Sequence, residues 1–218
     1  MHQLPNYNVY IFDCDGVILD SNQLKINAME NALINFFGSN NKVVDCIEYF
    51  KKNFGTSRFN HVKFFVNNIF MLSGSDKEIA YEEILLNYSA QCRSLYLLAD
   101  LTPGILEFIT KLKGKVYVAS GSEQNELRAV FKERNLEIYF QDIYGSPTAK
   151  VELVAKILQE SNSNKALMFG DALSDMDSAF SNSIDFIAYL PYSNVKKELE
   201  LASIERGFPV IHSWSSVT

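Results

Sequence analysis

The sequence lacks several features that mark secreted or membrane proteins. It has only three cysteines, Cys14, Cys46 and Cys92, an odd number at wide spacings that suits a reducing compartment and matches no metal-ligand pattern. No apolar run is long enough to span a bilayer. Residues 1–8 lack a basic stretch followed by an apolar one, as a signal peptide would require. We therefore expect a cytoplasmic protein with no membrane partner.

An excess of positive charge is also missing. Lysine and arginine number 20 against 26 aspartates and glutamates, which gives a net charge of −6. Binding to a nucleic-acid backbone requires a basic surface, so we expect no nucleic-acid partner. A small phosphorylated ligand remains possible, because a metal ion and a few local donors can balance its charge. We expect a monomer or a weak homodimer.

The pattern of apolar residues divides the chain into two parts. In residues 21–96 the apolar residues follow helical spacing with almost no strand signal, which predicts a bundle of about four helices. Around this segment, apolar strand-like runs alternate with helical ones: the runs are 9–12, 116–119, 143–144, 166–169 and 186–189. This alternation predicts a parallel sheet covered by helices on both faces. The fold class is therefore α/β, a Rossmann-like core (1–20 and 97–218) with a helical-bundle cap domain (21–96) inserted after its first strand.

Polar side chains gather where the predicted strands end, which is where open α/β sheets bind ligands. Reading only these ends gives one list: Asp13, Asp15, Ser120, Lys150, Asp171 and Asp175. Carboxylates buried together repel one another unless a cation neutralises them. A hard divalent ion with oxygen ligands satisfies that need, and Mg²⁺ suits an open site beside a phosphate. The strand ends therefore predict a magnesium site.

Four motifs carry a family resemblance. The stretch DCDGVILDS at 13–21 resembles the first motif of haloacid dehalogenase (HAD) superfamily phosphatases, and VASGS at 118–122 resembles the second. Lys150 is similar to the third motif, and GDALSD at 170–175 resembles the fourth, GDxxxD. The order of the motifs and the position of the helical insertion are also those of the family, in particular of members similar to β-phosphoglucomutase and phosphoglycolate phosphatase.

The resemblance implies a role for each residue. Asp13 would attack phosphorus to form an aspartyl phosphate, and Asp15 would act as general acid and base. Mg²⁺ would be held by Asp13, the backbone carbonyl of Asp15, and Asp171, with Asp175 either a ligand through water or a support for the others. Ser120 and Gly121 would bind the phosphoryl group, and Lys150 would neutralise charge on it.

Some positions depart from the family pattern or are ambiguous. Lys150 precedes Val151 where the third motif usually reads Lys-Pro. Arg58, which follows Gly-Thr-Ser, is similar to a cap arginine that reaches a second anionic group of the substrate, but it also suits an exposed helix start after the N-cap Ser57. Lys25 stands where mutases of the subfamily have histidine. It faces either the substrate or the solvent, and we expect it to be exposed. We expect Cys14 to be buried.

The sequence thus predicts a Mg²⁺-dependent phosphatase for a small phosphorylated metabolite, a sugar phosphate or a phosphoglycolate-like acid. A phosphomutase or a phosphonatase-like enzyme of the same family is the near alternative. A phospho-accepting receiver or binding protein is the alternative from another class. The scattered histidines His2, His61 and His212 match no ligand spacing.

Overall fold

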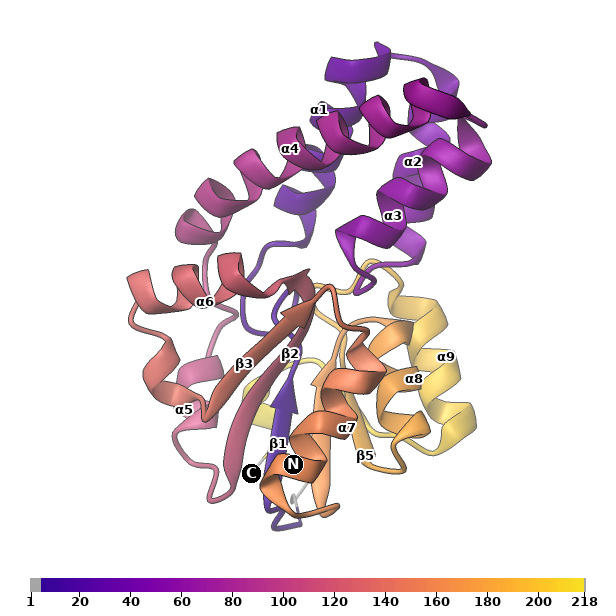
Figure 1. The fold of residues 1–218 in the computed structure, drawn as a ribbon. Helices are drawn as coiled ribbons and strands as arrows, with labels where there is room; N and C mark the ends of the chain where they lie inside the picture. The colour runs from indigo at the N-terminus through magenta and orange to yellow at the C-terminus, as the bar shows by residue number, and fades with distance from the viewer. Residues whose placement is uncertain (1–4, 218) are drawn as a thin grey trace.

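The computed structural model describes residues 5–217, so His2 lies outside the described part. Within it, six parallel strands form one sheet in the order β3-β2-β1-β4-β5-β6 (Figure 1). The strands are β1 (Val9–Phe12), β2 (Lys115–Glu123), β3 (Asp142–Ser146), β4 (Ala166–Gly170), β5 (Asp185–Tyr189) and β6 (Val210–Ile211). The strand order places β1 in the interior of the sheet, which explains why its four residues are all buried.

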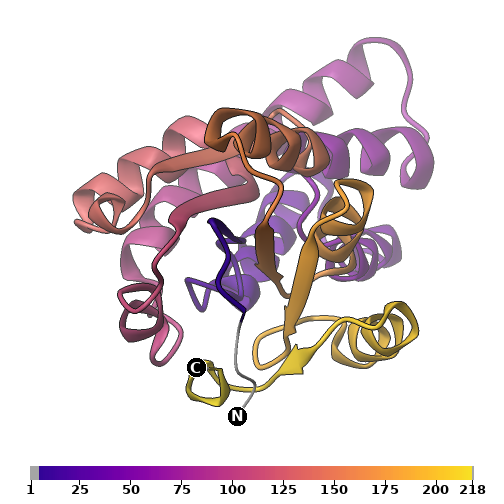
Figure 2. The same cartoon turned by 90° about the horizontal axis from the view of Figure 1, so that it is seen from below.

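Helices cover both faces of this sheet, as the view from below shows (Figure 2). In chain order they are α5 (Ile105–Ile109), α6 (Gln124–Glu133), α7 (Lys150–Ser161), α8 (Leu173–Ser181) and α9 (Lys196–Arg206). Side chains of β1 alternate between the two resulting cores: Val9 and Ile11 pack with α7, α8 and α9, whereas Tyr10 and Phe12 pack with α5 and α6. The predicted α/β fold class is confirmed. The short elements α5 and β6 were not predicted.

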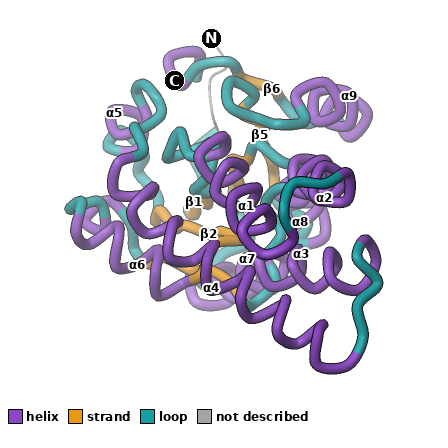
Figure 3. The backbone as a smooth tube through the Cα atoms, turned by 90° about the horizontal axis from the view of Figure 1, so that it is seen from above, coloured by secondary structure: helices purple, strands orange, loops and turns teal. Residues whose placement is uncertain are grey.

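The helical cap lies above the carboxyl ends of the strands (Figures 1 and 3). It consists of α1 (Asn22–Phe37), α2 (Asn41–Lys52), α3 (Arg58–Phe64) with a π-helical continuation (Phe65–Ile69), and α4 (Gly74–Leu98). N-cap side chains stabilise the first turns of α2 and α3. Asn40 accepts a hydrogen bond from Val43 N, and Ser57 accepts one from Asn60 N. The cap is thus a helical bundle whose helices follow one another along a single stretch of the chain.

Two chain segments join the cap to the sheet, and they run side by side. Asp20 N donates to Asp100 O at 2.8 Å, and Thr102 N donates to Ile18 O at 2.9 Å. These antiparallel bonds bring the chain back to the core beside the point where it left. The boundaries 1–20, 21–96 and 97–218 remain our proposal for the division into domains; α4 itself continues to Leu98. None of the helices among residues 5–217 is long and apolar enough to cross a membrane.

Candidate active site

The structure brings the six predicted strand-end residues together beneath the cap. Asp13 follows β1, Ser120 lies in β2, Lys150 begins α7 and Asp171 follows β4. Parallel strands end at the same edge of a sheet, so residues far apart in the sequence meet there. All six residues, including Asp15 and Asp175, are buried. A buried group of four carboxylates needs compensating positive charge, and the structure shows how part of it is supplied.

Lys150 lies between two of these carboxylates. Its Nζ is 2.8 Å from Asp13 Oδ1 and also donates to Asp175 Oδ1. Burial alone would lower the pKa of Lys150, but Asp13 and Asp175 outweigh that effect and raise it above its usual value. Lys150 is therefore a permanent cation beside Asp13. The prediction that placed Lys150 in the site, despite the missing proline after it, agrees with this geometry.

Asp13 and Asp171 still carry more negative charge than one lysine can balance. Burial raises the pKa of Asp13 to about 7, with Lys150 opposing the rise and Asp175 and Asp15 adding to it. The pKa of Asp171 is raised well above its usual range by burial and by the charges of Asp13 and Asp175. Both shifts mean that ionised Asp13 and Asp171 need a further cation nearby.

The donor set fits a divalent ion. Carboxylate oxygens of Asp13, Asp171 and Asp175 lie within 4.8 Å of one another. Asp171 Oδ2 accepts from Asn22 Nδ2 at 2.7 Å, but its buried Oδ1 has no hydrogen-bond partner among the described residues. Hard oxygen ligands at this spacing are those that Mg²⁺ prefers. The unpaired Oδ1 is the atom that a metal ion would use.

Gly16 lets Asp171 approach the first motif. Its φ is +73°, and a Cβ there would overlap Asp171 Oδ2 and lie 2.8 Å from Asp171 Cγ. Only glycine therefore fits between the first and fourth motifs at this point. The glycine of the DxDG motif thus has a steric reason in this chain.

Asp175 supports the loop of the fourth motif. One of its oxygens accepts from Lys150, and the other accepts from the backbone N–H groups of Asp171 (3.1 Å) and Ala172 (3.0 Å). With these bonds made, Asp175 fits the supporting role better than that of a ligand through water. Of the two roles left open by the sequence, the geometry favours the second.

Asp15 is held by four side chains. Lys25 Nζ donates to Asp15 Oδ2 at 2.8 Å, and Ser122 Oγ donates to the same oxygen at 2.9 Å. The Tyr96 hydroxyl lies 3.1 Å from Oδ2, and Ser21 Oγ donates to Oδ1 at 2.6 Å. Burial would raise the pKa of Asp15, but Lys25 and the hydroxyl donors outweigh it and lower that pKa. Asp15 is therefore a carboxylate in this arrangement.

The expectation that Lys25 is exposed was wrong. Lys25 is 8% exposed because its charge is paired with Asp15 at the base of the cap. Sequence reasoning also missed Tyr96 and Ser122, both buried partners of Asp15. Ser122 belongs to the second motif and could have been included on that ground, whereas nothing in the spacing of α4 distinguishes Tyr96 from a packing residue. Cys14 is fully buried, as predicted.

Arg58 lies between the cap and the core. Its Nη1 and Nη2 are 3.0 and 2.9 Å from the two carboxylate oxygens of Glu126 in α6. Arg58 is only 4% exposed, so the interpretation as a solvated arginine at a helix start was wrong. Ser57 caps α3, as expected. Glu126 was not identified from the sequence.

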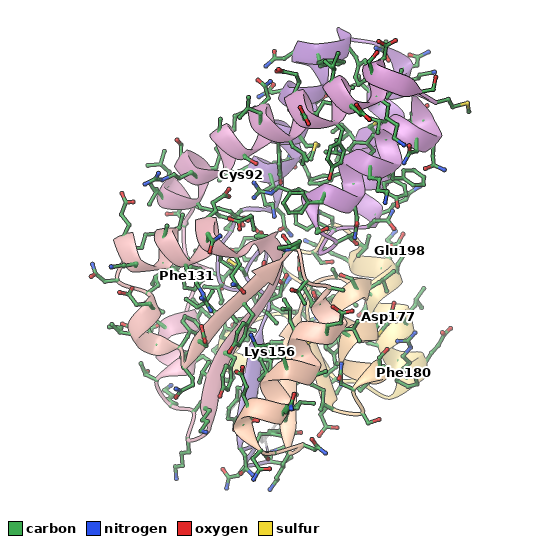
Figure 4. All side chains as sticks on the ribbon, viewed as in Figure 1. Cys92, Phe131, Lys156, Asp177, Phe180 and Glu198 are labelled. Carbon is green, nitrogen blue, oxygen red and sulfur yellow. The ribbon has the colours of Figure 1, made fainter. Side chains whose placement is uncertain are left out.

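Figure 4 shows side chains of the cap and of the core extending into the space between the two parts. A cavity of ≈ 330 Å³ there is bordered by Gly55 and Thr56 of the cap and by Gly121 and Lys150 of the core. A cavity bordered by Lys25, Arg58, His61 and Ser122 has a volume of ≈ 10 Å³, enough for about one water molecule. Ser120 is fully buried beside it, and its Oγ accepts from Ser122 N at 3.1 Å. A leaving group placed between Arg58 and Ser122 therefore requires the cap to move.

Comparisons with known proteins agree with this architecture. A family model described as haloacid dehalogenase-like hydrolase matches residues 7–181, which is most of the chain. The protein is thus a hydrolase by class, and it belongs to the haloacid dehalogenase-like family. The family prediction made from the four motifs is confirmed. A search of curated proteins found no match.

Solved structures share the fold over nearly the whole chain. A protein from Clostridium acetobutylicum described as a predicted phosphatase is 18% identical with a TM-score of 0.75, covering 97% of this chain and 96% of its own. CbbY from Rhodobacter sphaeroides, in complex with xylulose-(1,5)bisphosphate, is 15% identical with a TM-score of 0.73, covering 95% of each chain. A protein from Haemophilus somnus described as a predicted phosphoglycolate phosphatase is 12% identical with a TM-score of 0.66, covering 85% of this chain and 86% of its own.

Proposed function

We propose that this hydrolase is a Mg²⁺-dependent phosphatase that removes the phosphoryl group from a small phosphorylated metabolite through an aspartyl phosphate on Asp13. The observation that carries the proposal is the pairing of Asp13 with Lys150 at 2.8 Å, beside an Asp171 oxygen with no partner among the described residues. One carboxylate oxygen can attack phosphorus while lysine and a metal ion balance the charge of the phosphoryl group.

Each residue has a step in this reaction. Asp13 forms a bond to phosphorus while the bond to the leaving oxygen breaks. Asp15 takes up a proton before this step, when Lys25 of the cap has moved away from it, and then gives that proton to the leaving oxygen. Water then attacks the phosphorus and gives a proton to Asp15. The bond between the phosphorus and Asp13 breaks, which releases inorganic phosphate. Ser120 and the backbone at Gly121 bind phosphoryl oxygens, and Lys150 neutralises charge on them.

Asp13, Asp171 and the backbone carbonyl of Asp15 would hold the Mg²⁺, with Asp175 orienting the Asp171 loop. When bound, the ion supplies positive charge to the attacking carboxylate and to the phosphoryl oxygens. The raised pKa values of the buried Asp13 and Asp171, which ionise only with a further cation nearby, support this assignment. Cytoplasmic localisation and a monomeric or weakly dimeric state remain expectations.

The first substrates to test are sugar phosphates and phosphoglycolate-like acids. Of the proteins with a similar fold, CbbY is in complex with a sugar bisphosphate, and another is described as a predicted phosphoglycolate phosphatase. The experiment is a screen of phosphorylated metabolites with Mg²⁺, following release of inorganic phosphate by the protein and by Asp13→Asn. We expect activity only in the unchanged protein. Activity retained in Asp13→Asn would contradict the mechanism, and transfer of phosphate within the substrate without release would indicate a mutase.

A further inference from the structure

The cavity of ≈ 10 Å³ between cap and core is bordered by two cationic side chains, Lys25 and Arg58, and each is paired with a carboxylate. It borders Ser122 and Gly121, next to the phosphoryl-binding Ser120, on the core side, and Arg58 and His61 on the cap side. A leaving group attached to a phosphoryl group at Asp13 would extend into this space. The charges around the cavity therefore determine which leaving groups can be held there.

Arg58 uses three of its five N–H donors, and its charge is paired with a carboxylate. Its guanidinium makes two parallel bonds to Glu126, and Nη1 also donates to Ser89 Oγ at 2.8 Å. The group lies over the ring of Tyr88, 4.9 Å from its centroid. The side chains of Arg58 and Glu126 are 3% and 12% exposed, so water screens the pair little. Arg58 thus adds no free positive charge to the cavity.

The other basic groups around the cavity add none either. Lys25 is paired with Asp15 at 2.8 Å. Burial, together with the charge of Lys25, lowers the pKa of His61 to about 3, so its ring is neutral. The buried Nδ1 of His61 has no hydrogen-bond partner among the described residues, which suits a ligand with a neutral polar group. A second anion placed here would be buried without a cation to pair with, close to Glu126.

We propose that Glu126 is a specificity-determining residue, which occupies Arg58 when the cap closes and so selects phosphate esters of uncharged alcohols over those with a second anionic group. This inference rests on the proposed phosphatase function. The pair joins α3 of the cap to α6 of the core, so it parts when the cap opens and forms again only if the bound leaving group does not compete for Arg58. Repulsion between Glu126 and an anionic leaving group supplies the discrimination.

The test compares two phosphate esters of similar size, glycerol 3-phosphate and 3-phosphoglycerate, whose leaving groups differ by a hydroxymethyl group in place of a carboxylate. Both are measured as substrates and as competitors of p-nitrophenyl phosphate hydrolysis, with the unchanged protein and with Glu126→Gln. We expect the unchanged protein to prefer glycerol 3-phosphate. In Glu126→Gln, kcat/KM or inhibitor affinity for 3-phosphoglycerate should rise about tenfold or more, with glycerol 3-phosphate changed by less than about threefold.

Glu133→Gln is the matched control, because Glu133 is on the same helix, is exposed, and pairs with Arg93 only at 3.9 Å. It should leave both values unchanged. Equal binding of the two esters by the unchanged protein, or equal effects of Glu126→Gln on both, would overturn the inference while p-nitrophenyl phosphate is still hydrolysed. Failure to hydrolyse any phosphate ester, p-nitrophenyl phosphate included, would instead refute the phosphatase proposal.

Discussion

The backbone of Gly55 in the cap lies directly against the backbone of Gly121 in the core. A Cβ on Gly121 would overlap the carbonyl oxygen of Gly55 and lie 2.8 Å from its carbonyl carbon. Ser174 Oγ also donates to Phe54 O at 3.1 Å, so the loop before α3 sits on both the second and fourth motifs. The closed position of the cap thus depends on two residues without side chains.

Gly121→Ala should keep the cap from closing fully. The atoms that oppose the new methyl group, which belong to Gly55 and Thr56, are backbone atoms and cannot rotate away, so the cap must shift. We expect kcat/KM to fall about 100-fold, as a displacement of about 1 Å can cause, with thermal unfolding nearly unchanged. Small-angle scattering should show a larger radius of gyration for the variant. Unchanged activity and radius would mean that the closed cap is not required for turnover.

Tyr96→Phe tests the donors around Asp15. The variant keeps the ring but removes the hydroxyl that lies 3.1 Å from Asp15 Oδ2 and 2.5 Å from Ser122 Oγ. One bond to a charged group is lost and three donors remain, so we expect kcat/KM to fall about tenfold. Asp15→Asn should lose roughly two to four orders of magnitude.

Comparing two substrates with different leaving groups distinguishes a loss of Asp15 positioning from damage to the fold. An alkyl phosphate needs a proton on its leaving oxygen, whereas p-nitrophenolate leaves without one, so both variants should lose more activity with the alkyl phosphate. An equal loss of activity with the two substrates would show that Tyr96 only stabilises the fold. Tyr7→Phe, which removes an exposed hydroxyl bonded to Asp185, is the control.

Removing the metal should remove activity. We expect EDTA to abolish phosphate release and Mg²⁺ to restore it, because the carboxylates around Asp13 need a divalent cation. Asp171→Asn should raise the Mg²⁺ concentration needed for half-maximal activity more than Asp175→Asn does. Asp175→Asn should instead lower the melting temperature, because it weakens the contact with Lys150 and the bonds to two backbone N–H groups. Full activity after exhaustive chelation, or the reverse order of the two variants, would contradict the assignment.

His61 should make the protein less stable in mild acid. Burial lowers the pKa of His61 from 6.5 to about 3, so between these values the unfolded chain binds a proton that the folded chain does not. Stability therefore rises with pH across this window and is lost as the pH falls below about 6.5. At pH 5 the loss attributable to His61 should be about 2 kcal/mol relative to pH 7.5.

His61→Gln should reduce this slope. Urea unfolding of both proteins at pH 5 and pH 7.5 measures the difference, and comparing the two proteins cancels the other groups that titrate in this range. The same pH dependence in both would mean that His61 does not remain neutral in the folded protein.

The sequence by itself determined the fold class and identified six of the polar residues that meet beneath the cap. Short apolar runs alternating with helical spacing require a parallel sheet, and parallel strands bring Asp13, Ser120 and Asp171 to one edge wherever the chain goes between them. Asp13 and Asp171 could be identified because each directly follows a strand, so the local pattern determines their place.

The tertiary structure decided which charges pair. Lys25, Arg58 and Asp175 each had two interpretations from the sequence, because a charged side chain at a helix start reads the same whether it faces water or a buried partner. Tyr96 contacts Asp15 although the two are 81 residues apart in the sequence. Glu126 contacts Arg58 across 68 residues. Such contacts depend on how the cap packs on the core, and no periodicity along the chain records that packing.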